Sequence, residues 1–244
     1  MNAKHYAFRF SLAAFYASGL ARLMQSSTQG LGAILMFHHV RPWRATPFDP
    51  HRGLEIEPAF LDLVISELKA KGWDIVSMDD VAGRLRAPTG RPFAALTFDD
   101  GYRDNVEHAL PILRRHGTPF TVYVTSGFAD GEAALWWLDL ADSVAREPKP
   151  AKAFAALYRD WRRRPDLIAR IAERTDPTAA RERTRALCLD WDALRTLADE
   201  PLCTIGAHTL THPILGALDP AAAVGEIAGS KRTIEERLGR TIRH

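Results

Sequence analysis

Residues 93–105 read FAALTFDDGYRDN, an apolar run that ends in two adjacent carboxylates, Asp99 and Asp100. Continuous apolar runs of this length are typical of strands that are buried on both faces. Two neighbouring carboxylates at the end of a buried strand repel each other and lose hydration, so a metal ion, an arginine or water is needed to offset that cost. The stretch therefore predicts a buried strand with a charged site at its carboxyl end.

Apolar and amphipathic segments alternate on both sides of this stretch. Short strands are expected at 33–37, 74–77 and 120–124, and helices from Pro58 to a stop at Gly72, over 78–85 and over 104–116. Strands that alternate with helices indicate a parallel sheet covered on both faces, as in a doubly wound sheet or a (β/α) barrel. In either architecture, reactive groups lie at the carboxyl ends of the strands.

A second apolar segment ends in two histidines. Residues 203–212 read CTIGAHTLTH, and His208 and His212 are four residues apart, so one helical turn would bring both imidazoles to the same side. Two histidines and one carboxylate leave coordination positions open, as expected of a catalytic metal site rather than a structural one. Adjacent residues of an extended chain point in opposite directions, so one aspartate can bind the metal while the other transfers protons. A metal ion beside a base fits the hydrolysis of an amide or an ester.

The motifs TFDDGY at 97–102 and HTLTHP at 208–213 resemble the first two signature motifs of the polysaccharide deacetylases, the NodB-homology family of carbohydrate esterases. Three further segments are similar to this family: ILMFHHV at 34–40, GWDIVSMDDV at 72–81 and DWDALRTLA at 190–198. The resemblance covers most of residues 30–240. It implies an α/β fold, a distorted (β/α)7 TIM-like barrel.

The resemblance also implies roles for the site residues. By this resemblance Asp99 is the general base, and Asp100, His208 and His212 are the ligands of a divalent metal ion. Thr209 is expected to orient the histidine loop. The expected metal is Zn²⁺, with Co²⁺, Ni²⁺ or Mn²⁺ as alternatives. The implied reaction removes acetyl groups from the N-acetylated or O-acetylated sugars of a poly- or oligosaccharide, so the expected partner is an acetylated glycan.

Other functions stay open at this point. The chain could be a non-catalytic metal- or carbohydrate-binding remnant of such an enzyme, or a hydrolase of a non-sugar amide. Non-haem iron oxygenases also use two histidines and one carboxylate. The pair Asp99–Asp100 favours hydrolysis over oxygenation, because an oxygenase needs no adjacent base.

The carboxyl-terminal end departs from the family pattern. Members of the family continue past the helix at 219–238 with motifs that supply the general acid, whereas this sequence ends at GRTIRH. We therefore expect a domain that is incomplete at its carboxyl end and a barrel that this chain does not close. His244 is not assigned the acid role.

The chain is expected to have two parts, an amphipathic segment at 1–30 and a deacetylase-like domain at 31–244 with a helical insertion at about 130–190. Within the insertion, Trp136 and Trp137 are expected to anchor it to the core rather than to line a sugar groove. Residues 159–185 hold nine arginines and five acids, which favour a solvated helix surface over an anion-binding patch.

The amino-terminal segment contains an uncharged run, FSLAAFYASGLA, that is too short to span a bilayer. Lys4 and Arg9 precede it as in a signal peptide, but no clean A-x-A cleavage site follows. Apolar residues of 8–24 fall on one helical stripe, which suits either docking on the domain, the favoured alternative, or contact with a membrane surface. A cytoplasmic location, or one peripheral to the inner membrane, is favoured over secretion.

The composition is that of an ordinary globular chain, with 244 residues, 46% hydrophobic residues and a formal net charge of +2. This balance does not indicate a nucleic-acid partner. Cys188 and Cys203 are the only cysteines and have no CxxC spacing, so neither a disulfide framework nor a cysteine zinc site is expected.

Several polar residues near the strand ends are expected to have structural roles. His38 and His39 end the first strand, and satisfied strand-end histidines are favoured over substrate contacts. Asp104 is expected to cap the helix that follows the TFDDGY motif. Arg103 and Asn105 are placed outside the site.

Overall fold

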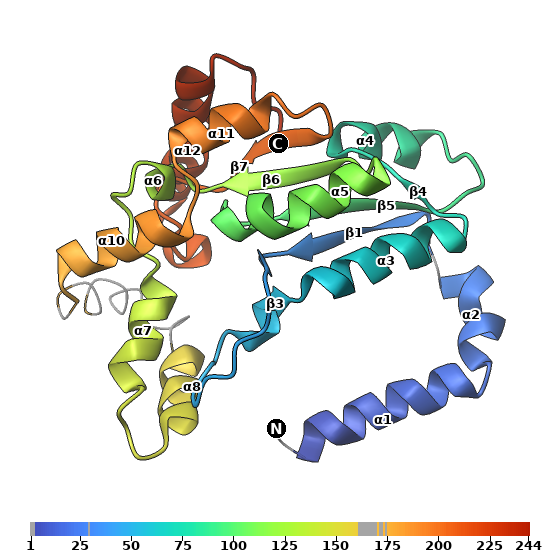
Figure 1. Ribbon diagram of the computed structural model, residues 1–244, viewed down its shortest axis with the longest axis horizontal. Coiled ribbons are helices and arrows are strands. Elements are labelled where there is room, and N and C mark those ends of the chain that lie inside the picture. Colours follow the sequence, from blue (N-terminus) through green and yellow to red (C-terminus); the bar gives the residue numbers. More distant parts are fainter. Residues whose placement is uncertain (1–2, 29, 161–169, 171–172, 174) are drawn as a thin grey trace.

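The computed structural model describes residues 3–28, 30–160, 170, 173 and 175–244, and its centre is a parallel five-stranded sheet (Figure 1). The strands are β1 (Gly32–Phe37), β4 (Asp74–Ile75), β5 (Phe93–Phe98), β6 (Phe120–Val124) and β7 (Cys203–Ala207). β1 pairs along one side of β5, whereas β4 and then β6 pair along its other side, and β7 pairs with β6. The predicted α/β architecture with parallel strands is confirmed.

Helices connect the strands and cover the sheet (Figure 1). They are α3 (Pro58–Ala70), α4 (Met78–Arg86), α5 (Leu110–His116), α11 (Trp191–Ala198) and α12 (Pro220–Leu238). After β1, the chain forms a short parallel pair from β2 (His39–Val40) and β3 (Glu55–Ile56). Single turns of 3-10 helix lie at Arg52–Leu54 and Leu215–Ala217.

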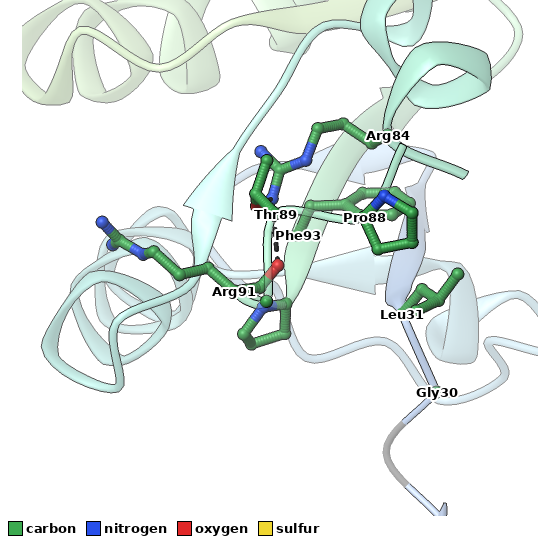
Figure 2. A pocket seen from close by; sticks show the side chains of 9 residues that line it. Gly30, Leu31, Arg84, Pro88, Thr89, Arg91 and Phe93 are labelled. Atoms are coloured by element: carbon green, nitrogen blue, oxygen red, sulfur yellow. Dashed lines mark hydrogen bonds between the residues drawn. The ribbon is translucent and has the colours of Figure 1, made fainter. Parts of the chain in front are cut away.

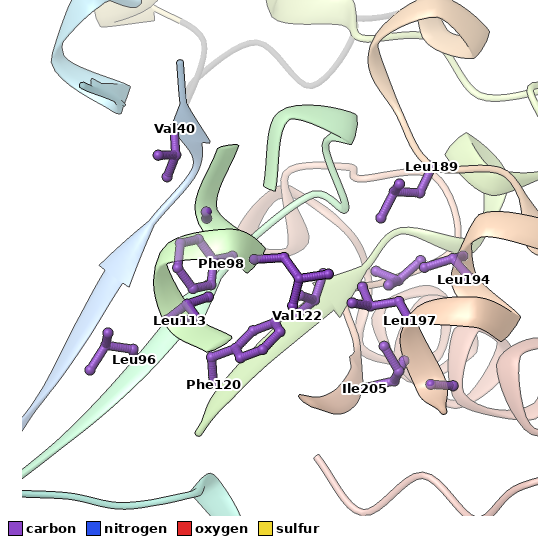
Figure 3. Close-up of a cluster of buried hydrophobic side chains, with 14 of the residues drawn as sticks. Val40, Leu96, Phe98, Leu113, Phe120, Val122, Leu189, Leu194, Leu197 and Ile205 are labelled. Carbon is purple, nitrogen blue, oxygen red and sulfur yellow. The ribbon is translucent and has the colours of Figure 1, made fainter. Parts of the chain in front are cut away.

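The side chains of β5 are buried at every position, and five of the six are apolar. All six of its side chains are at most 3% exposed, because Phe98 and its neighbours on one face pack in the main apolar cluster and Phe93 and Ala95 on the other face pack with Val81 of α4. The main apolar cluster joins Phe98 and Val122 of the sheet to Leu113 of α5 and Leu194 of α11 (Figure 3). The strand that carries the carboxylates is therefore fixed on both faces.

Two predicted elements differ from the structure in extent. The strand expected at 74–77 ends at Ile75, because Ser77 caps α4 and its hydroxyl accepts a hydrogen bond from the backbone N–H of Asp80. The helix expected at 104–116 begins as a π-helical segment, Asn105–Ala109, before α5. Pro111 has no N–H to donate to an earlier carbonyl, which disfavours a continuous α-helix here.

The outer strands of the sheet are β1 and β7, and among the described residues no strand joins them. The barrel is therefore open in this chain, as expected. Next to β7, the N–H of Ala207 donates to the carbonyl of His244 at 2.9 Å.

The segment between β6 and β7 contains α6 (Ser126–Ala129), α7 (Trp136–Val144), α8 (Pro150–Asp160) and α10 (Pro177–Leu187). Trp136 and Trp137 are buried in a second apolar cluster with Phe128 and Leu140, so they pack in the core. Part of the arginine-rich stretch lies outside the described residues. Within the described part, Arg183 binds Asp139 at 3.1 Å and Asp142 at 2.6 Å.

The amino-terminal helices α1 (Ala3–Ala17) and α2 (Leu20–Thr28) extend away from the sheet (Figure 1). From Tyr6 to Ala17, every side chain of α1 is exposed, so the predicted docking of this stripe on the domain is wrong. Among the described helices, none combines the length and the apolarity needed to cross a bilayer.

Candidate metal centre

Asp99 and Asp100 lie at the carboxyl end of β5, where the sequence predicted them. The N–H of Asp99 donates to the carbonyl of Phe37 in β1 at 2.9 Å, which continues the sheet by one residue. Asp100 and Gly101 then turn the chain with positive φ angles of 71° and 68°. Both carboxylates are buried, with residue exposures of 8% and 3%.

His208 and His212 lie in an irregular loop after β7. Thr209 and His212 have φ angles of 68° and 56°, so the loop is not the helical turn that the four-residue spacing suggested. The hydroxyl of Thr209 accepts a hydrogen bond from the N–H of His212 at 3.1 Å. This contact fits the orienting role that we expected of Thr209.

Left-handed backbone conformations are concentrated at the candidate metal site. In the described part of the chain, the non-glycine residues with positive φ are Asp100, Thr209 and His212. Such conformations cost free energy for residues with a side chain and persist only where the surrounding structure enforces them. Two of these three residues are predicted metal ligands, so the strain coincides with the candidate site.

The predicted ligands converge. Oδ1 of Asp100 lies 3.2 Å from Nε2 of His212 and 3.5 Å from Nε2 of His208. Ligand atoms from all three residues lie within 4.8 Å of one another. Two strand ends that are about one hundred residues apart in the sequence thus bring an oxygen and two nitrogen donors to one point.

The charges at the site differ from those of isolated side chains. Burial raises the pKa of Asp99 from 3.8 to about 6, and the neighbouring charge of Asp100 adds to this effect. Burial also acts to raise the pKa of Asp100, but contacts with His212 and His208 outweigh it and hold that pKa below its ordinary value. Burial lowers the pKa of His208 to about 4. At neutral pH, His208 is therefore neutral and Asp100 ionised, the states in which both bind a metal.

We expect Asp99→Asn to stabilise the metal-free protein more at pH 8 than at pH 5. The folded-state pKa of Asp99, about 6, exceeds its ordinary value of 3.8. The folded protein therefore holds more protons than the unfolded chain between these values, and this carboxyl lowers stability as the pH rises through 6. The stabilisation should be ~1 to 2 kcal/mol larger at pH 8. Urea unfolding of both proteins at both pH values measures it, and a gain independent of pH would contradict it.

Residues that the sequence reasoning missed hold the histidine loop. Glu226 of α12 accepts hydrogen bonds from the N–H groups of Leu210 and Thr211 at 2.8 and 2.9 Å. Nε1 of Trp136 donates to the carbonyl of His212 at 3.0 Å. Gly127 approaches Leu210 so closely that a Cβ atom would lie 2.5 Å from its carbonyl oxygen. Helices of the insertion and α12 thus fix the loop on several sides.

We expect Trp136→Phe to weaken metal binding by about tenfold, because it removes the N–H that positions the backbone of His212. Trp191→Phe is a matched control. Trp191 is similarly buried, and its Nε1 donates to Asp130 instead of to the histidine loop. Titration of both metal-free variants with Zn²⁺ measures the effect. Equal affinities for the two variants would show that the Trp136 contact does not position the ligand.

The other strand-end residues have structural partners. Nδ1 of His39 lies 2.6 Å from Oδ2 of Asp104, and the ring of His39 stacks on Tyr102. Asp104 therefore does not cap its helix with its side chain as predicted, because its carboxylate binds His39 and the N–H of Val40. His38 stays near the site, since the charges of Asp100 and His212 influence its pKa, which burial lowers. Nε2 of His244 contacts Asp79 at 3.0 Å.

A pocket of about 110 Å³ lies at the opposite, amino-terminal end of β5 (Figure 2). Its arginines have internal partners: Arg84 and Arg91 both bind Asp74, at 2.9 and 3.1 Å. Arg84 also donates to Thr89 and to the carbonyl of Arg91. Both guanidinium groups of this pocket are thus paired with the same carboxylate, Asp74, within the fold.

Comparison with protein-family models identifies one family. The family model for polysaccharide deacetylases matches residues 86–244, more than half of the chain. No curated protein matches the chain.

Solved structures share the fold at low sequence identity. The deacetylase PplD of Streptococcus pyogenes, solved in complex with acetate, is 18% identical with a TM-score of 0.55, over 86% of this chain and 70% of that chain. IcaB from Ammonifex degensii is 18% identical with a TM-score of 0.53, over 87% and 71% of the two chains. A de-N-acetylase from Aggregatibacter actinomycetemcomitans is 16% identical with a TM-score of 0.53, over 87% and 77%. The open sheet is thus part of the distorted (β/α)7 fold of such deacetylases.

Proposed function

Because the chain belongs to the polysaccharide deacetylase family, we propose that it hydrolyses acetyl groups on the sugars of a poly- or oligosaccharide, with a divalent metal ion and a carboxylate base. The convergence of Asp100, His208 and His212 beside Asp99 is the observation that carries this proposal. The proposed metal ligands are Asp100, His208 and His212, and the proposed base is Asp99.

The donor atoms fit a divalent metal ion. Oδ1 of Asp100 is buried and lies 3.2 and 3.5 Å from Nε2 of His212 and His208, but among the described residues it accepts no hydrogen bond of good geometry. A buried acceptor without a donor costs free energy that a cation would recover. Two imidazoles and one carboxylate are the ligand set of catalytic zinc sites, so we propose Zn²⁺ first, with Co²⁺, Ni²⁺ or Mn²⁺ as alternatives.

A divalent ion in this place supplies Lewis-acid chemistry, which activates water and polarises a carbonyl group. The chain supplies the base. The carboxylate of Asp99 takes a proton from water as the water oxygen forms a bond with the acetyl carbon. The bond from that carbon to the sugar nitrogen or oxygen then breaks as that atom takes up the proton that Asp99 accepted, so the products are acetate and the free amine or hydroxyl of the sugar. Asp99 has a pKa of about 6 in the metal-free protein, and a neighbouring cation lowers the pKa of a carboxyl group, so this base is ionised at neutral pH.

Acetylated glycans are the proposed substrate class. Among the solved structures described above, one deacetylase was captured with acetate and another is named a de-N-acetylase. These names support acetyl as the group that is removed. Chitooligosaccharides, cell-wall chains, exopolysaccharides and lipid-linked sugars all carry such groups, and we propose this class without choosing among its members.

The experiment is acetate release by the Zn²⁺-loaded protein. N-acetylglucosamine oligomers and small acetyl esters are the substrates, and the assay is run with and without oxygen. Acetate release that is independent of oxygen supports the hydrolase and excludes the iron oxygenase. Zn²⁺ binding without turnover of any substrate would indicate the non-catalytic remnant instead, and turnover of simple amides alone would indicate a non-sugar amidase.

A further inference from the structure

Helices α1 and α2 form an apolar surface that the rest of the described chain does not cover. Large apolar side chains on both helices are exposed, among them Phe8 at 63%, Phe10 at 76% and Leu23 at 82%. Tyr16, Phe15 and Met24 are also exposed. Figure 1 shows both helices extending away from the sheet and its covering helices. We name α1 and α2 together the amino-terminal helix pair.

The charge of this helix pair has one sign. The sequence contains no aspartate or glutamate before Asp49, whereas Lys4, Arg9 and Arg22 lie within the two helices. Arg9 and Arg22 are exposed among the apolar residues. This local excess of positive charge contrasts with the whole chain, whose formal net charge is only +2.

We propose that the amino-terminal helix pair binds the surface of an anionic lipid bilayer. Exposed Phe, Leu and Tyr side chains enter the boundary between headgroups and acyl chains, and basic residues are attracted to anionic headgroups. A second copy of this chain is the less suitable occupant, because two helix pairs with the same positive charge repel each other. A lipid surface provides both the apolar layer and the opposite charge.

The position of the helix pair is compatible with the proposed enzyme activity. α2 leads into the amino end of β1, whereas the candidate metal centre lies at the carboxyl ends of β5 and β7. The strands are parallel, so the helix pair joins the sheet at the end opposite to the site. Attachment at that end leaves the metal centre accessible to a glycan.

The test is sedimentation of the full chain with two kinds of vesicle, phosphatidylcholine alone and phosphatidylcholine with about one third phosphatidylglycerol. We expect binding to the anionic vesicles and much weaker binding to the neutral ones. Arg9→Gln with Arg22→Gln should weaken binding to anionic vesicles by about 20- to 30-fold. Phe8→Ser with Phe15→Ser should weaken it at least tenfold, because less apolar surface enters the bilayer.

Matched controls make the same changes elsewhere on the surface. One control, Arg146→Gln with Arg232→Gln, removes an exposed arginine from the turn after α7 and another from α12. The other control, Leu63→Ser with Leu85→Ser, removes one exposed leucine from α3 and one from α4. Both controls should bind as the parent does. Thermal unfolding checks that every variant is folded. We expect all of them to fold, because the changed side chains are exposed.

Three results would overturn the proposal. The first is absence of binding to either vesicle, and the second is equal binding to neutral and anionic vesicles. The third is self-association without vesicles that Phe8→Ser with Phe15→Ser abolishes, since it would identify a second copy as the occupant. Acetate release from a soluble oligosaccharide is measured separately, so failure of the proposed function and failure of membrane binding are distinguishable.

Discussion

Asp99→Asn should lower the rate of acetate release by about 10²- to 10⁴-fold, the usual contribution of a general base, while the protein keeps its metal ion. An amide cannot accept the proton that the attacking water loses. It has nearly the same shape as the carboxyl group, so the packing at the end of β5 should survive. Asp100, which provides the ligand oxygen, is unchanged.

Three measurements separate the role of Asp99 from a general loss of structure. The metal content of the variant should equal that of the parent, and its melting temperature should not fall. Asp139→Asn, a change at another buried carboxyl whose pKa burial also raises, should retain the parent rate within about threefold. The pH profile gives the third measurement, because the rate of the parent should rise with pH as Asp99 loses its proton. The pKa of Asp99 is about 6 in the metal-free protein and a bound cation lowers it, so this rise should lie at or below pH 6. Undiminished turnover by Asp99→Asn would exclude Asp99 as the base.

The fold was predictable where one physical rule decided the structure. The run FAALTF is buried on both faces, and burial favours an almost continuous apolar run, here interrupted only by Thr97, so its strand and its place in a parallel sheet follow from the sequence. The carboxylates that follow it had to lie at the carboxyl edge. The same rule placed His208 and His212 at that edge, because they follow another strand of the sheet.

The details of the histidine loop were not predictable from spacing. His208 and His212 converge through left-handed backbone at Thr209 and His212, and not through a helical turn. That backbone is enforced by contacts from Gly127, which precedes the insertion, from Trp136 within it, and from Glu226 on the helix that follows the loop. The local sequence pattern carries no information about such partners, because the residues that flank each of them in the sequence indicate only an ordinary helix.

Two further differences have the same origin in tertiary contacts. Asp104 has the residue type and position of a helix cap, but the imidazole of His39, which a different strand supplies, binds its carboxylate instead. The stripe on α1 has the pattern of a docked helix, yet its side chains are exposed. An apolar stripe predicts that one face of a helix is buried, but the sequence does not identify the surface that covers this face.

Asp100→Ala, His208→Ala and His212→Ala should each weaken Zn²⁺ binding by at least about 10²-fold, more than is expected of a residue that only positions a ligand. Each change removes one of the three donor atoms that lie within 4.8 Å of one another. Asp100→Ala should have the largest effect, because its carboxylate faces both histidines and provides the only negative charge among the three ligands.

Stability gives a readout of this loss that does not depend on activity. With Zn²⁺ at 100 times the Kd of the parent, binding should stabilise the parent by about 2.7 kcal/mol, whereas a variant with 10²-fold weaker binding should gain only ~0.4 kcal/mol. His116→Ala is a suitable control, because His116 pairs with Asp62 on the outside of the fold and should leave the metal-dependent gain unchanged. Thermal unfolding with and without Zn²⁺, together with elemental analysis of the purified proteins, measures both quantities. If all three variants retain Zn²⁺ and its stabilising effect as the parent does, the metal lies elsewhere, because no single site built on Asp100, His208 and His212 could lose a ligand without a loss of affinity.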